Sequence, residues 1–310
     1  MKILIIGGLG HLGFELTKLI KETLPDSQVT IVDDLSGNLF NYDQKLGFIN
    51  HNKLATGVFK DLPNDLHTYD LAFDFTLPKV SDFGYQFSKI PNQLVNPEVI
   101  RQALAFYALP CKHKVLIADY TMGRLLSRIV AFDSNLLNSY MHILPDCIGG
   151  VNVNGSVLYS MRNHLKGQLI SHKATDKAVR LLITPTVDAL FSILQITIDK
   201  MYKSPTPPKI YLYVGTPTSM YLFKRKCVVA LCKVYPEAAK EVSTREGLVF
   251  SNCPRENPQT DVTGVNGFRG IISLYPTAIK YVTLDTPKRV DMALLRIAQT
   301  AVKFHLAGIQ

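Results

Sequence analysis

The chain has 310 residues, of which 47% are hydrophobic and 19% charged, and this balance is typical of a globular protein and excludes a disordered or fibrous one. The formal net charge is +9, but the basic residues are spread along the chain, so we interpret them as a solvated surface and do not expect nucleic acid as a partner. No apolar run reaches the roughly 18 residues of a membrane-spanning helix. We therefore expect a soluble, cytoplasmic protein without a membrane partner.

Short β-branched segments alternate along the chain with longer segments of helical periodicity. In chain order, the predicted elements are a strand at Lys2–Ile6, a helix with Leu12, Leu16, Leu19 and Ile20 at helical spacing, strands at Val29–Val32, Thr56–Phe59 and Leu71–Phe75, a helix at Pro97–Tyr107, a strand at Val115–Asp119, a helix at Met122–Phe132, a strand at Met141–Leu144, a helix at Val187–Met201, a strand at Ile210–Val214 and a helix at Tyr221–Val234. This alternation favours an α/β fold, a doubly wound parallel sheet of the Rossmann type.

The five cysteines form no C-x-x-C pair, and the eight histidines show no ligand spacing. Neither a disulfide framework nor a metal site is predicted.

The first predicted strand runs directly into the glycine-rich turn GGLGHLG, residues 7–13, and a helix follows. Glycine permits the tight turn and lets the backbone approach a pyrophosphate, which assigns Gly7, Gly10 and Gly13 to a dinucleotide site. The amides of His11 and Leu12, at the helix N-terminus, would hold the phosphates.

Two carboxylates, Asp33 and Asp34, follow the second predicted strand, twenty residues after Gly13. A carboxylate at this point accepts hydrogen bonds from the adenosine ribose and repels a 2′-phosphate. The predicted cofactor is therefore NAD, and NADP is less favoured.

Two stretches, 151–177 and 251–275, break the alternation of strands and helices. We predict a dinucleotide-binding Rossmann domain of residues 1–150, to which a later strand and helices from about 178–234 return. Residues 151–177 and 235–310 are predicted to form a smaller C-terminal substrate-type domain.

The pattern Gly7-x-x-Gly10-x-x-Gly13, with VDDLSGN at Val32–Asn38, resembles the extended short-chain dehydrogenase/reductase family of NAD-dependent nucleotide-sugar epimerases and dehydratases. YDLAFDFTL (Tyr69–Leu77), KVLIAD (Lys114–Asp119) and KIYLYVGTPTSMYLF (Lys209–Phe223) are similar to later strands of that family, in the same order. The resemblance implies an oxidoreductase that passes hydride between a bound nicotinamide and a nucleotide sugar or another small phosphorylated ligand. It also implies a possible homodimer.

The resemblance assigns further residues to sites. Phe59 lies in the segment that meets the adenine, and Phe75 and Thr76 follow the fourth strand, so these three are expected to contact the cofactor. Arg180 lies where the family often places an arginine, and it is expected to bind a substrate phosphate.

The catalytic segment departs from the family pattern. The family's fifth strand leads to a Ser/Thr, a loop of some twenty residues and a helix bearing Y-x-x-x-K, whereas here Asp119 is followed at once by Tyr120, Thr121 and a predicted helix with Arg124. A tyrosine is a poor base at neutral pH unless a positive charge lowers its pKa. Arg124 would supply that charge and Thr121 the hydroxyl, or Tyr120 itself occupies the place of the hydroxyl.

Two functions follow from these residues. In the first, the protein is an NAD-dependent enzyme in which Tyr120 is the acid/base, tuned by Arg124. In the second, it is a catalytically inactive relative that acts as a nucleotide-binding regulator, scaffold or assembly protein, because the loop and the lysine are absent. A fold alone does not decide between them.

Overall fold

A computed structural model describes residues 1–33, 54–55, 62–77, 97–120, 122–123, 126–127, 130, 136, 138–149, 157–167, 170, 180–203, 209–238, 279–284 and 287–308. For 54–55, 97–99 and 180 the backbone alone is described.

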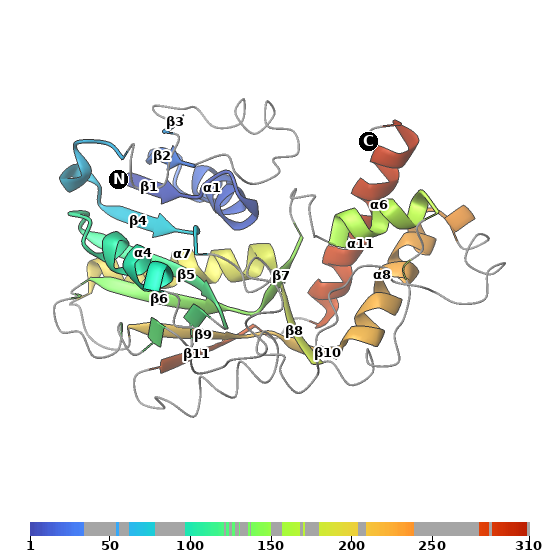
Figure 1. Cartoon of the computed structure of the whole chain (residues 1–310). Coiled ribbons are helices and arrows are strands. Elements are labelled where there is room, and N and C mark those ends of the chain that lie inside the picture. Colours follow the sequence, from blue (N-terminus) through green and yellow to red (C-terminus); the bar gives the residue numbers. More distant parts are fainter. Residues whose placement is uncertain are drawn as a thin grey trace.

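The described strands form one large parallel sheet and one small sheet. The large sheet has eight strands in the order β11-β9-β6-β5-β4-β1-β2-β3 (Figure 1). Its strands are β1 (Lys2–Ile6), β2 (Gln28–Val32), β3 (Leu54–Ala55), β4 (Leu71–Asp74), β5 (His113–Asp119), β6 (Ser139–Leu144), β9 (Ile210–Val214) and β11 (Ile279–Thr283). All neighbouring pairs are parallel, and the strand order reverses between β1 and β4. The predicted doubly wound Rossmann sheet is confirmed.

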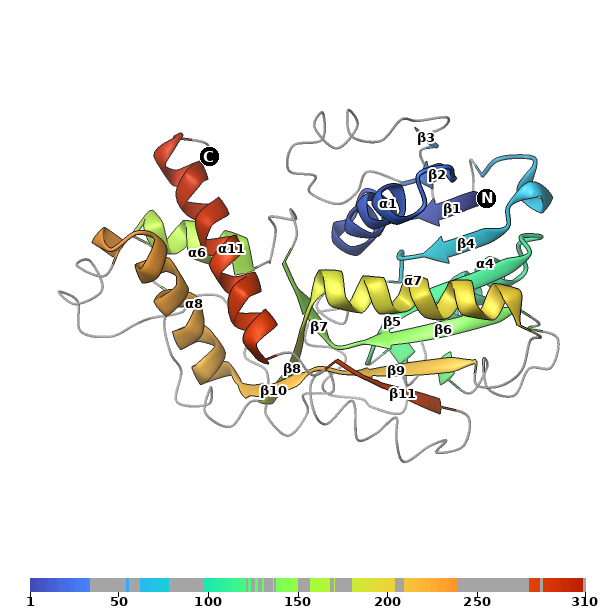
Figure 2. The same cartoon turned by 180° about the vertical axis from the view of Figure 1, so that it is seen from behind.

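Helices cover both faces of the large sheet. On one face α1 (His11–Thr23) and α7 (Thr186–Tyr202) pack side by side over alternate residues of the strands (Figure 2). On the other face lie α4 (Pro97–Tyr107) and the helical residues that follow β5. Because the central strands are covered on both sides, their residues are apolar without polar alternation, as in KILII of β1.

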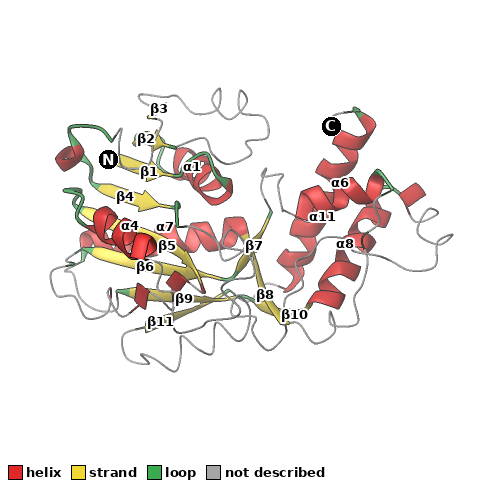
Figure 3. Cartoon of the chain, in the orientation of Figure 1, coloured by secondary structure: helices red, strands yellow, loops and turns green. Residues whose placement is uncertain are grey.

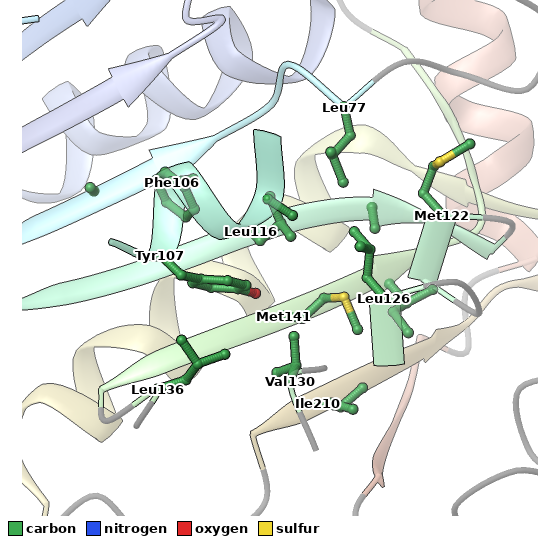
Figure 4. Close-up of a cluster of buried hydrophobic side chains, with 14 of the residues drawn as sticks. Leu77, Phe106, Tyr107, Leu116, Met122, Leu126, Val130, Leu136, Met141 and Ile210 are labelled. Carbon is green, nitrogen blue, oxygen red and sulfur yellow. The ribbon is translucent and has the colours of Figure 1, made fainter. Parts of the chain in front are cut away.

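The core beneath α4 is continuous across the large sheet from β2 to β11. Phe106 and Tyr107 of α4 pack there, as do Met122, Leu126 and Val130, and Figure 4 shows these side chains against those of the strands. The residues from the strands include Leu4, Ala72, Leu116, Met141 and Ile210. The described residues between 120 and 130 are helical, so a helix follows β5 at once.

A second unit lies beyond the end of β6 (Figure 3). It contains the small sheet β10-β8-β7, with β7 (Asp146–Ile148), β8 (Arg180–Pro185) and β10 (Thr216–Ser219), and the helices α6 (Val157–Leu165), α8 (Met220–Val234) and α11 (Pro287–Leu306). We call this unit the helical lobe. Its core is formed by the facing sides of the three helices and by Ile148, Leu181 and Ile183 of the small sheet.

Only single residues separate the large sheet from the helical lobe at two places. Pro145 lies between β6 and β7, and Gly215 lies between β9 and β10. A Cβ at Gly215 would lie 2.7 Å from the carbonyl oxygen of Ile183, so only glycine fits between β10 and β8 there.

The predicted elements agree closely with the structure where residues are described. β1, β9 and α4 have the predicted bounds, and the other predicted elements shift by a few residues at their ends. The predicted strand at Thr56–Phe59 lies outside the described residues. Strands β7, β8, β10 and β11 and helix α11 were not predicted. For the stretch that contains α6, only a helical centre was predicted.

The division into domains differs from the expected one for α8, for β11 and for β7, β8 and β10, which form the separate small sheet. Helix α8 was expected to return to the Rossmann domain, but its apolar side packs on α11 and α6 in the helical lobe. Strand β11 was expected in the smaller domain, but it pairs in parallel with β9 at the edge of the large sheet. Among the described helices, none has the length and apolar character needed to cross a membrane.

Candidate functional site

The turn between β1 and α1 is closed so tightly that side chains are excluded from it. A Cβ on Gly13 would lie 2.3 Å from the carbonyl oxygen of Gly7 and 2.7 Å from the Cα of Gly8. Gly7 has φ +73°, a conformation that side chains rarely adopt, and its amide donates to the carbonyl of Val32 over 2.7 Å. The first amides of α1 therefore meet the carboxyl end of β1 with bare backbone, and this geometry fits a bound pyrophosphate.

Asp33 holds this turn from the neighbouring strand. Its carboxylate lies just after β2, is 6% exposed, and accepts a hydrogen bond of 2.8 Å from the amide of Leu9. Asp33, which was predicted to bind the adenosine ribose, thus also stabilises the turn, because its Oδ2 accepts the hydrogen bond from Leu9. Asp34 lies outside the described residues.

The side chain of His11 connects the start of α1 to the small sheet. Its Nε2 donates a hydrogen bond to the carbonyl oxygen of Gly149, and the hydroxyl of Thr186 donates to the same oxygen over 3.2 Å. Gly149 follows β7, and Thr186 is the first residue of α7. The glycine turn, the end of β7 and the start of α7 therefore meet at one point.

The segment after β4 lies against the glycine turn and is fixed by a chain of hydrogen bonds. The Thr76 hydroxyl donates to Asp74 Oδ1 over 2.5 Å and accepts from Gln102 Nε2 of α4, also over 2.5 Å. The Thr76 amide donates to the same Asp74 oxygen over 2.8 Å. Because its hydroxyl faces Asp74, Thr76 presents its methyl group to Gly7, where a Cβ would lie 3.0 Å from it.

Asp74 is a fully buried residue at the carboxyl end of β4. Its other oxygen, Oδ2, has no hydrogen-bond partner among the described residues. Burial raises the pKa of Asp74 to about 6, although the two hydrogen bonds from Thr76 act to lower it. The carboxyl of Asp74 therefore changes its protonation state close to neutral pH. No role was predicted for Asp74, which lies in the segment YDLAFDFTL (Tyr69–Leu77).

Tyr120, the predicted acid/base, is buried and its hydroxyl is engaged. The side chain is 0% exposed, and its hydroxyl donates over 2.5 Å to the backbone carbonyl of Tyr213 in β9. Burial, and then the charges of Asp146 and Cys147, raise the pKa of Tyr120 well above its ordinary value. In this position the hydroxyl is closed to a ligand, and the geometry argues against proton transfer by Tyr120. Its catalytic role remains a prediction.

The helix after β5 begins in a way that fixes Tyr120 in the core. Asp119 Oδ1 accepts from the amide of Met122 over 2.8 Å, which is an N-cap contact. Gly123 then packs so closely on β6 that a Cβ would lie 2.6 Å from the side chain of Ile143. The structure therefore agrees with the prediction that the helix starts directly after the strand, without an intervening loop.

A buried histidine on the other face of the sheet was missed. His142 of β6 is 0% exposed, and its Nδ1 lies 2.8 Å from the hydroxyl of Tyr213. Burial lowers the pKa of His142 to about 3, so the ring is neutral at physiological pH. Its position within a predicted strand was the only signal in the sequence, and the contact with Tyr213 depends on the pairing of β6 with β9.

Among the remaining predicted site residues that the structure describes, Phe75 lies at the glycine turn and Arg180 does not. Phe59, Thr121 and Arg124 lie outside the described residues. The backbone of Arg180 opens β8 and pairs with Ser219, at the opposite end of the strand from Thr186. At about 3.3 Å per strand residue this is roughly 20 Å from Thr186. Phe75 lies beside Gly7, since a Cβ on Gly7 would be 3.3 Å from its carbonyl carbon. No cluster of three metal-ligating side chains occurs among the described residues.

Solved structures with this architecture cover nearly the whole chain. TunA, an NAD-dependent NDP-hexosamine 5,6-dehydratase of tunicamycin biosynthesis, superposes with a TM-score of 0.64 at 15% identity, over 97% of each chain. The Bordetella bronchiseptica enzyme WbmF, in complex with NADH, gives 0.62 at 16% identity, over 99% of this chain and 93% of that one. The Bacillus cereus UDP-glucuronic acid 4-epimerase, with UDP-glucuronic acid and NAD, gives 0.62 at 14% identity, over 98% and 100%.

The chain has the fold of these enzymes. No family model matches it, and no curated protein matches it by sequence. The resemblance to extended short-chain dehydrogenases/reductases is therefore confirmed as a likeness of fold, which the sequence carries at 16% identity or less in these three comparisons. The glycine turn and the two-unit organisation are the features of that fold that position a ligand.

Gly13→Ala tests the close approach in the turn. The added methyl group would meet backbone atoms of Gly7 and Gly8, which have no rotamer to yield, so we expect a loss of about 1–3 kcal/mol in the free energy of unfolding. Gly10→Ala is the matched control, because a Cβ there would approach only the Gly7 carbonyl oxygen, at 3.3 Å. Urea unfolding of both variants measures the difference, and equal stabilities would contradict the geometry.

Asp74→Asn tests the buried carboxyl through pH. The folded pKa of about 6 lies above the ordinary 3.8, so the contribution of Asp74 to the stability of the wild type is greatest below pH 4 and falls as pH rises through 6. The loss amounts to about 3 kcal/mol at pH 8. Asparagine keeps the acceptor for Thr76 and removes the charge, so the variant should be the more stable protein at pH 8 and should lose this advantage at pH 4. Thermal unfolding across this range provides the measurement, and parallel curves for the two proteins would refute the assignment.

Proposed function

We propose that this protein is an NAD-binding member of the extended short-chain dehydrogenase/reductase family whose second ligand is a nucleotide sugar. The similar structures support this proposal: WbmF has been solved with NAD⁺ and UDP, and the Bacillus cereus epimerase with UDP-glucuronic acid and NAD. When bound, NAD supplies a hydride acceptor, and reversible oxidation of the sugar is the chemistry of epimerases and dehydratases.

The observation that carries the cofactor assignment is the bare backbone of the glycine turn. Gly13 and Gly7 leave no room for side chains between β1 and α1, and Asp33 holds the turn by its bond to the Leu9 amide. In this proposal the first amides of α1 bind the pyrophosphate, the Asp33 carboxylate accepts from the adenosine ribose, and Thr76 lies with its methyl group under the cofactor.

Asp33→Asn tests the cofactor assignment. The amide oxygen can still accept from Leu9, so the turn is kept, while the negative charge toward the ribose is lost. We expect the Kd for NAD to rise by about tenfold, because hydrogen bonds to charged groups are stronger by about 1 kcal/mol or more. Discrimination against NADP should fall as well. Calorimetric titration of both proteins with both cofactors measures this, and an unchanged NAD affinity would show that Asp33 does not meet the ribose.

A second candidate function has its own support. The buried Tyr120, whose hydroxyl donates to the Tyr213 carbonyl, favours a catalytically inactive relative that binds NAD and a nucleotide as a regulator, scaffold or assembly protein. In an enzyme that uses this tyrosine as acid/base, the hydroxyl has to reach the substrate. The two candidates share the ligands and differ in turnover.

Tyr120→Phe separates the two candidates. If Tyr120 is structural, the variant loses about 1–3 kcal/mol of stability, because the Tyr213 carbonyl is left buried without its donor, and NAD binding is retained. If Tyr120 is the acid/base, turnover falls by about a hundredfold or more. The assay is absorbance of reduced nicotinamide and sugar products over a panel of nucleotide sugars. Wild-type turnover that the variant loses would exclude the inactive reading, and no turnover in either protein would exclude catalysis by Tyr120 on that panel.

A further inference from the structure

We propose that His11 is a positioning residue that couples occupation of the glycine turn to the placement of the helical lobe. The proposal rests on the proposed binding of NAD at that turn. It assigns a role to the imidazole itself, which the cofactor assignment does not use, since a pyrophosphate is bound there by backbone amides.

The contact of the imidazole is specific and joins three elements. Nε2 of His11 donates to the carbonyl oxygen of Gly149 and lies 3.4 Å from the hydroxyl of Thr186, which donates to the same carbonyl over 3.2 Å. Two donors thus share one oxygen, and both of its lone pairs are used. The bond also defines the tautomer, with the proton on Nε2.

Both partners of His11 directly follow the paired strands β7 and β8 of the small sheet. β7 and β8 are parallel, and Ile148 is opposite Pro185, so the next residues, Gly149 and Thr186, leave the small sheet side by side. Gly149 has φ +109°, which lets its carbonyl turn toward α1 and which a side chain would oppose. A displacement of the small sheet therefore moves the oxygen that His11 contacts.

The same residue faces the ligand on its other side. His11 is the first residue of α1, so its amide is one of those that would hold the pyrophosphate, while its side chain holds Gly149. Fixing the amide on a phosphate also fixes the direction in which the imidazole points. This is the physical route by which a ligand at the turn would act on the small sheet, and α6, α8 and α11 pack on that sheet.

An ion pair also joins the two units near this point, and it is weaker. Arg289 of α11 pairs with Asp188 in the first turn of α7, over 2.8 Å, but the arginine side chain is 66% exposed. Exposed ion pairs contribute little, with typical values of about 0–1 kcal/mol, and are screened by salt. The half-buried contact of His11 with Gly149 is therefore the better candidate for coupling the glycine turn to the small sheet.

Hydrogen exchange with NAD as the probe tests the coupling. In the wild type, NAD at ten times its Kd should slow amide exchange in peptides covering β7 and β8 by up to about tenfold, the limit set by ligand linkage. In His11→Phe this slowing should disappear from β7 and β8. In His11→Gln it should persist, because the amide nitrogen of glutamine takes the place of Nε2 and still donates to Gly149. Each titration is run at ten times the variant's own Kd.

Three outcomes would overturn the proposal: equal slowing in His11→Phe and the wild type, loss of slowing in His11→Gln, or NAD binding in the wild type with no effect on β7 and β8. If the wild type does not bind NAD at all, the proposed function fails instead. The contact is then judged without ligand: exchange in β7 should be several-fold faster in His11→Phe than in the wild type and restored in His11→Gln. Unchanged exchange there would show that the imidazole does not hold the small sheet.

Discussion

The close approach of α1 to the end of β1 is the constraint on which the rest of the ligand edge depends. With Gly13 against the carbonyl of Gly7, no atom beyond the backbone fits between helix and strand. The carboxylate of Asp33 then fixes the turn to β2 through the amide of Leu9, and the methyl group of Thr76 closes it from β4. Three neighbouring strands thus shape one small region of bare amides at the point where the strand order reverses.

The carboxyl end of β5, the strand next to β4, differs from the region around the glycine turn. At β5 the chain enters a helix without a loop, because Asp119 caps it at once and Gly123 allows it to lie directly on β6. As a result Tyr120 belongs to the core, with its hydroxyl on the backbone of β9. A tyrosine in this environment stabilises strand and helix packing and is held neutral, whereas a catalytic tyrosine needs a lowered pKa and access to a ligand. The end of β1 therefore presents bare backbone, whereas the tyrosine that follows β5 is enclosed in the core.

The sequence predicted most of the large sheet, because its signals are local. β1, β9 and α4 have the predicted bounds since each is a continuous apolar or periodic run with clear ends. The glycine turn was recognisable because steric exclusion acts between residues only a few positions apart. α11 was missed although Val290, Leu294, Ile297, Ala301 and neighbours repeat at helical spacing, so this signal was present and was not used. The short strands β7, β8 and β10 have no such signal, since their partners are distant in sequence.

The candidate site was less predictable for a related reason. The carboxylate of Asp33 and the glycines follow from spacing, but the burial of Tyr120 depends on a contact 93 residues away, and the bond from His11 to Gly149 on one 138 residues away. Asp74 shows the same limit. Its raised pKa arises from complete burial next to α4, which no local pattern records.

The connections through Pro145 and Gly215 have a mechanical consequence. They leave the large sheet from neighbouring strands, β6 and β9, and enter the small sheet on the two sides of β8. A third connection adds to these, because Thr186 of α7 follows Pro185 of β8 directly and α7 packs on the large sheet. Three short backbone connections, through Pro145, Gly215 and the Pro185–Thr186 peptide bond, therefore restrain the position of the helical lobe relative to the large sheet.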